Sequence, residues 1–107
     1  MAFSDDMPLR AEEAAGFLKG LANTHRLLVL CALAEGEKNV SQLIEVTQIA
    51  PTSMSQHLNK LKQEGIVDFR REHRTLFYFI SHPMVRELMP LLHRHFCEMG
   101  LQEHSRA

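Results

Sequence analysis

Hydrophobic residues recur at helical spacing in four segments of the first 65 residues. Residues 10–21 carry an amphipathic stripe, whereas residues 24–35 are apolar nearly all round, which predicts a buried central helix. Ser41 is predicted to cap a short third helix. Pro51 suits the first turn of a fourth helix that ends at Gly65. The pattern therefore predicts four helices before residue 66.

After Gly65 the pattern changes from helical to alternating. Residues 66–69 and 76–80 are rich in β-branched and aromatic residues, and the polar residues 70–75 separate them. Two such strands joined by a short polar segment predict a hairpin with a basic tip.

Pro83 begins a last helix with hydrophobic residues along one side. Pro90 falls inside this helix and lacks a backbone N–H, so a kink or break is predicted between Arg86 and Pro90. The predicted domain covers residues 9–99, with flexible segments at 1–8 and 100–107.

Two short helices joined by a tight turn and followed by a basic hairpin predict a winged helix-turn-helix. The fold class is mainly α with a small β-hairpin wing. In this class the second helix lies in the DNA major groove, where its first residues reach base edges.

The predicted recognition helix carries short neutral hydrogen-bonding groups at its start and lysines further along, with no acidic residue between 52 and 63. Gln and Asn bond adenine, Ser and Thr adapt to several bases, and Lys and Arg reach phosphate. The candidate DNA-binding residues are Thr52, Ser53, Ser55, Gln56, His57, Asn59, Lys60 and Lys62 on the helix, and Arg70, Arg71 and Arg74 on the wing. The residue types leave one alternative to DNA binding open. In this alternative the polar face of the helix is exposed only to solvent, and His57 packs locally.

Composition narrows the class of protein. A chain of 107 residues supports one domain, and no apolar run reaches the length of a membrane span. The first residues lack the features of a signal peptide, so we expect a cytoplasmic protein. The net charge is −1, but residues 52–74 carry two more basic than acidic side chains. The sequence contains no glycine-rich phosphate loop, nucleophile elbow or His-Glu-x-x-His motif, so neither an enzyme nor a cofactor is predicted.

Three segments of the chain resemble the ArsR/SmtB family of winged-helix repressors: LANTHRLLVLCAL (21–33), NVSQLIEVTQIAPTSMSQHLNKLKQEGIV (39–67) and RREHRTLFYFI (70–80). The resemblance implies a homodimer, with the first and last helices at the interface and two recognition helices on an inverted-repeat operator. It places Ser53, Ser55, Gln56 and His57 on the turn that contacts bases and phosphates. Gln48 stands where the family often has glycine, and Ala50 where a capping serine is common.

The chain has two cysteines, Cys31 in the central helix and Cys97 near the end of the last helix. By itself a cysteine in an apolar helix is a small hydrophobic residue. The pair resembles the dithiol (BigR/SqrR/HlyU-like) branch of the family. This resemblance implies a sensor in which oxidants or reactive sulfur species join the two sulfurs by a disulfide or polysulfide bridge. The thiolate is the reacting form, which His93 and Arg94 would favour and a helix C-terminus would oppose.

A metal sensor is the alternative reading of the same resemblance. Residues 41–49 contain no cysteine, so a thiophilic-metal site in that helix is not predicted. His82 and His93 have the separation of a family zinc site, yet their expected partners are Ile80 and Phe96, which cannot ligate. No metal site is therefore predicted, unless His95 or a cysteine completes one.

Two further classes stay open. A thiol peroxidase would use both cysteines, and turnover of peroxide or persulfide without DNA would reveal it. A protein-interaction module would use Met84, Met89 and Met99, although methionine at this spacing usually packs in a core. A DNA mobility shift that survives competitor DNA would exclude the second class.

Overall fold

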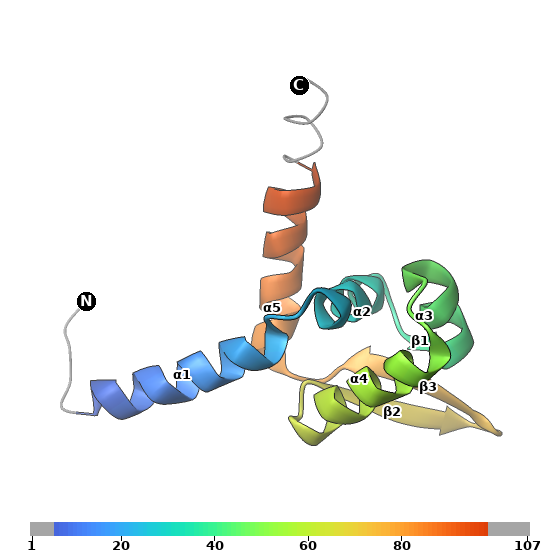
Figure 1. Cartoon of the computed structure of the whole chain (residues 1–107), viewed down its shortest axis with the longest axis horizontal. Coiled ribbons are helices and arrows are strands. Elements are labelled where there is room, and N and C mark those ends of the chain that lie inside the picture. The colour runs from blue at the N-terminus through green and yellow to red at the C-terminus, as the bar shows by residue number, and fades with distance from the viewer. Residues whose placement is uncertain (1–5, 99–107) are drawn as a thin grey trace.

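The computed structural model describes residues 6–98, which form helices around a small sheet (Figure 1). In chain order the elements are α1 (Met7–Leu21), α2 (Thr24–Ala34), β1 (Lys38–Asn39), α3 (Val40–Thr47), α4 (Pro51–Gln63), β2 (Val67–Glu72), β3 (Thr75–Ile80), α5 (Pro83–Leu92) and the π-helix η1 (His93–Glu98). The helix-turn-helix consists of α3 and α4, and the hairpin β2–β3 forms the wing. The predicted fold class is confirmed.

The sheet is antiparallel, with strand order β1-β3-β2. The pairing of Arg70 with Phe77 and of Glu72 with Thr75 shows that the hairpin turn contains only His73 and Arg74. His73 has φ +58°, which closes this tight turn. The predicted basic tip at residues 70–75 is therefore too long, because strand pairing extends through its polar residues. The third strand, β1, was not predicted, since its two residues carry no strand pattern.

The core lies between α2, α4, the sheet and α5. Val29 and Leu30 of α2 are fully buried at its centre, as the apolar pattern of this helix predicts. The inner face of α4 contributes a buried stripe, and residues of β2, β3 and α5 complete the core. The buried residues on these four elements are Met54, Leu58, Leu61, Val67, Tyr78, Ile80, Val85 and Met89. The recognition helix is thus held by hydrophobic packing, with its polar face outward.

Helices α1 and α5 project away from the rest of the molecule in different directions (Figure 1). The radius of gyration is 16.0 Å, compared with roughly 13 Å for a compact domain of this size. Large hydrophobic side chains are exposed on both helical arms: Leu18 is 54% exposed and Phe96 is 76% exposed. Helix α1 begins at Met7, three residues before its predicted start, and its apolar stripe is exposed at Ala14 and Leu18, half-buried at Phe17 and buried at Leu21.

Asn39, Gln48 and Gly65 set the ends of α3 and α4. Asn39, not Ser41, caps α3: its side chain accepts from the backbone N–H of Gln42, whose side chain accepts from Asn39 N–H in return. The prediction for Ser41 is wrong, because strand β1 leads the chain directly into the helix at Val40. Gln48 ends α3 with φ +61°, the left-handed conformation that favours glycine. Gly65 has φ +74° after α4, where Ile66 N–H bonds Leu61 C=O at 2.9 Å.

The last helix differs from its prediction. Helix α5 continues through Pro90 without a break between Arg86 and Pro90, and the irregular part comes later, as the wider turns of η1. Pro83 occupies the first turn as predicted. The predicted flexible tail at residues 100–107 lies outside the described residues. None of the described helices has the length and hydrophobicity needed to cross a membrane.

Candidate DNA-binding surface and cysteine pair

The recognition helix α4 presents most of the predicted residues to solvent. Its candidate residues are exposed except for Ser53 and His57, which are half-buried: the exposed ones are Thr52, Ser55, Gln56, Asn59, Lys60 and Lys62. This arrangement follows from the helical period, because Met54, Leu58 and Leu61 take the opposite face into the core. Ala50, at the N-cap, makes no side-chain cap, so the first backbone N–H groups of α4 have no partner from that side chain.

The lysines near the end of α4 contact acidic residues. Lys60 Nζ lies 3.6 Å from Glu64 Oε1, and Lys62 Nζ lies 3.4 Å from Asp68 Oδ1. Lys62 also lies 5.0 Å from the centre of the Phe69 ring. Both pairs are largely exposed, where ion pairs contribute little stability, so both lysines can exchange their carboxylate for a phosphate.

The half-buried His57 packs locally as well as facing the recognition surface. Its ring lies 5.4 Å from that of His25, edge to face, so the two histidines connect the middle of α4 with the start of α2. Partial burial, together with the charges of His25 and Arg26, lowers the pKa of His57, which keeps it neutral at neutral pH. A neutral His57 can read a base by hydrogen bonding but adds no positive charge. His25 was not singled out in the sequence, because nothing local indicates its contact with residue 57.

The three wing arginines have different surroundings. Alternation along β2 places Arg71 on the face that carries Val67 and Phe69, and Arg70 on the opposite face. Arg71 and Arg74 are exposed and form no ion pair with any of residues 6–98. Arg70 is paired with two glutamates, Glu37 and Glu72. The sequence did not reveal this difference, because Glu37 lies 33 residues away along the chain.

The two cysteines line the same cavity, which lies between α2 and the last helical segment. The cavity has a volume of about 390 Å³, and apolar side chains dominate its wall. Its lining residues are Leu27, Cys31, Met89, Leu92, His93, Phe96 and Cys97. Both thiols are free and half-buried. Tertiary packing thus brings together two sulfurs that are 66 positions apart in the chain.

The surroundings of Cys31 favour its protonated form. Burial, and then the proximity of Cys97 and Glu35, raises the pKa of the Cys31 thiol. A second cavity of about 470 Å³ reaches Cys31 from the side of Glu35, His93 and Arg94. Cys31 is therefore open to small molecules from two sides while remaining a thiol at neutral pH.

The zinc alternative gains no support from the arrangement of histidines. Within the described part of the chain, no three His, Cys, Asp or Glu side chains gather where they could hold a metal ion. His82 Nδ1 accepts a hydrogen bond from the backbone N–H of Met84 at 3.2 Å, and its ring packs against Phe17. His82 therefore acts as the N-cap of α5.

A helix-turn-helix with an outward polar recognition helix and a hairpin wing defines a winged helix-turn-helix DNA-binding protein. Residues 23–68 match the family described as bacterial regulatory protein, arsR family. The chain is 37% identical to the biofilm growth-associated repressor of Xylella fastidiosa, over 92% of this chain and 86% of the repressor. The chain belongs to the ArsR family of transcriptional regulators, which are DNA-binding proteins and not enzymes.

Solved structures agree with this assignment. Reduced HlyU from Vibrio cholerae superposes with a TM-score of 0.82 and 35% identity, covering 88% of this chain and 99% of HlyU. A homodimeric winged helix-turn-helix DNA-binding domain from Mycobacterium bovis superposes with a TM-score of 0.73 and 33% identity, covering 97% of this chain and 96% of that domain. The resemblance noted in the sequence is confirmed at the level of the family.

Proposed function

We propose that this protein is a homodimeric repressor that binds an inverted-repeat operator while Cys31 and Cys97 are reduced. Reactive sulfur species or oxidants bridge the two sulfurs and release the operator. The observation that carries this proposal is the cavity that both cysteines line between α2 and the last helix. A pair of thiols facing one hollow can be joined directly, or through inserted sulfur atoms if the gap is wider.

The proposed dimer uses the projecting helices α1 and α5. Exposed hydrophobic side chains on these helices and on η1, such as Leu18, Leu91 and Phe96, would be buried against a second copy. The homodimeric state of the Mycobacterium bovis domain supports the formation of a dimer. A two-fold dimer would present two α4 helices to half-sites about 34 Å apart, one turn of DNA.

On DNA the proposed roles follow the exposure of the side chains. Gln56 and Asn59, with Ser55 and Thr52, read base edges, while Ser53 and His57 contact the backbone or bases from their half-buried positions. Lys60, Lys62, Arg71 and Arg74 neutralise phosphates. The bases that are read specify the operator, and the phosphate contacts supply most of the affinity.

The bridging chemistry with a persulfide R–S–SH needs no other oxidant. We assign the first attack to Cys97, because Cys31 is held as a thiol. The Cys97 thiolate attacks the outer sulfur, forms a new S–S bond and expels the thiolate RS⁻. Cys31 then loses its proton, attacks Sγ of the Cys97 persulfide and expels hydrosulfide. The cysteines are oxidised to a disulfide while the persulfide is reduced to a thiol and hydrosulfide, and each inserted sulfur consumes one further persulfide.

Such a bridge ties the central helix to the helix at the proposed dimer interface. Because packed interfaces adopt discrete arrangements, a small shift there changes the distance between the two α4 helices. The bridged dimer then fits the operator poorly, and by linkage the operator disfavours bridging to the same extent.

The test uses purified, reduced protein and an inverted-repeat fragment from its own promoter region. We expect the protein to retard the fragment in the presence of competitor DNA, and a low-molecular-weight persulfide to release it. Mass spectrometry of the treated protein should show the loss of two hydrogens for a disulfide, plus one sulfur for each atom inserted. Operator binding that persulfide leaves unchanged would contradict the proposal.

The phosphate contacts of the wing can be tested separately. Arg71→Gln should weaken operator and competitor binding alike, because a phosphate contact carries no sequence information. The slope of log K against log salt should fall by about one unit per lost contact, and so by about two units for a dimer. Filter binding between 50 and 200 mM salt, a range of roughly fourfold over which such slopes are measurable, checks this. A loss of affinity for the operator alone would instead assign Arg71 to base reading.

A further inference from the structure

Arg70 has the surroundings of a structural ion pair and not of a free phosphate ligand. Its guanidinium donates from Nε, at 2.7 Å, and from Nη2 to the same Glu37 oxygen, and from Nη1 to Glu72 Oε2 at 3.1 Å. The guanidinium carbon also lies 4.8 Å from the centre of the Phe77 ring. One positive and two negative groups leave this cluster with a net charge of −1, which disfavours a DNA phosphate.

Glu37 connects this cluster to the helix that carries Cys31. Glu37 lies three residues after the end of α2 at Ala34 and directly before β1. Because β3 lies between β1 and β2 in the sheet, the contact of the Glu37 side chain with Arg70 on β2 spans β3. The bond with Arg70 lowers the pKa of the Glu37 carboxyl, which keeps it charged at neutral pH. The far end of α2 and the middle of the wing are thus joined by a side-chain contact.

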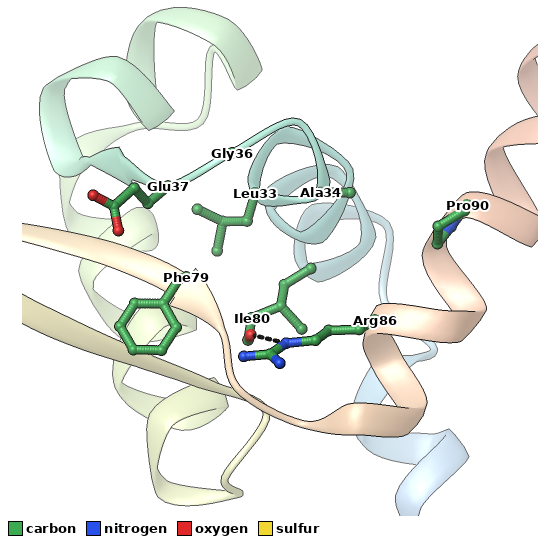
Figure 2. Close-up of a pocket in the computed structure, with 8 residues that line it drawn as sticks. All are labelled: Leu33, Ala34, Gly36, Glu37, Phe79, Ile80, Arg86 and Pro90. Carbon is green, nitrogen blue, oxygen red and sulfur yellow. Dashed lines mark hydrogen bonds between the residues drawn. The ribbon is translucent and has the colours of Figure 1, made fainter.

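The connection is also held at both of its ends: Gly36 N–H bonds Leu33 C=O at 3.1 Å, and Lys38, in the strand that pairs with β3, donates to Ala32 C=O at 2.9 Å. Gly36 has φ +149°, and a Cβ placed there would have no heavy atom within 4 Å. A hollow of about 360 Å³ lies between the connection, β3 and α5. Figure 2 shows Glu37 on the strand side of this hollow, with Arg86 and Pro90 of α5 on the opposite side. Alongside the backbone pairing of β1 with β3, the pair of Glu37 with Arg70 joins this connection to the more distant strand β2.

We propose that Glu37 and Arg70 are positioning residues that fix the wing to the end of α2 and carry movements of the Cys31 helix to the DNA-binding surface. Arg70 then contributes to operator binding through the position of Arg71 and Arg74, and not through a phosphate contact of its own. The part of this inference that concerns Cys31 rests on the proposed function.

The first test measures operator affinity and its salt dependence for Glu37→Gln, Arg70→Gln and the double variant. We expect each single variant to weaken operator binding by about two- to fivefold, which corresponds to the free energy that an exposed ion pair contributes. The double variant should bind no more weakly than either single variant, because both changes remove the same interaction. The salt slope should stay at the wild-type value, in contrast to Arg71→Gln. Glu35→Gln is the matched control, because it removes the same charge nearby from a glutamate that pairs with Lys38 at 3.5 Å.

Opposite results would overturn the inference. If Arg70 binds phosphate and Glu37 merely competes for it, Glu37→Gln will bind the operator more tightly, and Arg70→Gln will lower the salt slope as Arg71→Gln does. Affinities that match those of Glu35→Gln would also overturn it.

The second test measures the ratio of operator affinities before and after persulfide treatment. We expect a smaller ratio for Glu37→Gln than for the wild type, with the same bridge detected by mass spectrometry. A wild-type protein whose operator binding does not respond to persulfide would refute the proposed function. The salt dependence of the Glu37 and Arg70 variants would still test the structural role of the Glu37–Arg70 pair. An undiminished ratio in Glu37→Gln would refute the coupling alone.

Discussion

Replacing Cys31 or Cys97 by Ser is expected to abolish release by persulfide while leaving operator binding of the reduced protein within about threefold of wild type. Both thiols are half-buried, and the change of sulfur to oxygen leaves the recognition helix untouched. A single remaining cysteine can acquire a persulfide but cannot form an intramolecular bridge. The measurement is fluorescence anisotropy of labelled operator, before and after treatment, for each variant.

The two single variants are controls for each other, because each retains one reactive thiol. A Cys31→Ala variant separates loss of bridging from any cost of placing a hydroxyl in the apolar cavity. If the double Cys→Ser protein were still released by persulfide, the dithiol mechanism would be wrong. Titration with zinc would then be the next measurement.

Replacing Leu58 by Ala is expected to lower the free energy of unfolding by about 2–5 kcal/mol. Leu58 is 1% exposed and lies on the inner face of α4 between Met54 and Leu61. The lost packing and the cavity left behind act together, because surrounding elements relax only in part. Urea unfolding at a fixed protomer concentration measures the effect, since dimerisation makes stability depend on concentration.

Asn59→Ala is the matched control for Leu58→Ala, one position further along the same helix. Asn59 is exposed, so its removal should change the free energy of unfolding by less than about 0.5 kcal/mol. Its operator affinity should fall on the order of tenfold if it bonds a base edge. An Asn59→Ala protein that binds the operator like the wild type would remove this residue from the reading set.

The sequence alone predicted the helix-turn-helix and the wing because each depends on local patterns. The helical period of α4 sets Met54, Leu58 and Leu61 against the outward polar residues, and the alternation after Gly65 indicates the hairpin. Proline and glycine mark the ends of α4 for reasons of backbone geometry. Ser41 was wrongly predicted as a cap because the strand β1, which ends at Asn39, is stabilised by pairing with β3 and not by local propensity.

The contacts that distinguish similar residues from one another required the tertiary structure. Arg70 and Arg71 are adjacent and chemically identical, yet strand alternation and Glu37 give them opposite surroundings. The shared cavity of Cys31 and Cys97, and the burial that raises the pKa of the Cys31 thiol, arise from the packing of α5 on α2. Local periodicity thus determined the four helices before residue 66, the hairpin and the start of α5, but not β1 or η1. Only long-range packing decided which partners the charged and reactive side chains of this protein have, because hydrogen bonds, burial and charge act through space and not along the chain.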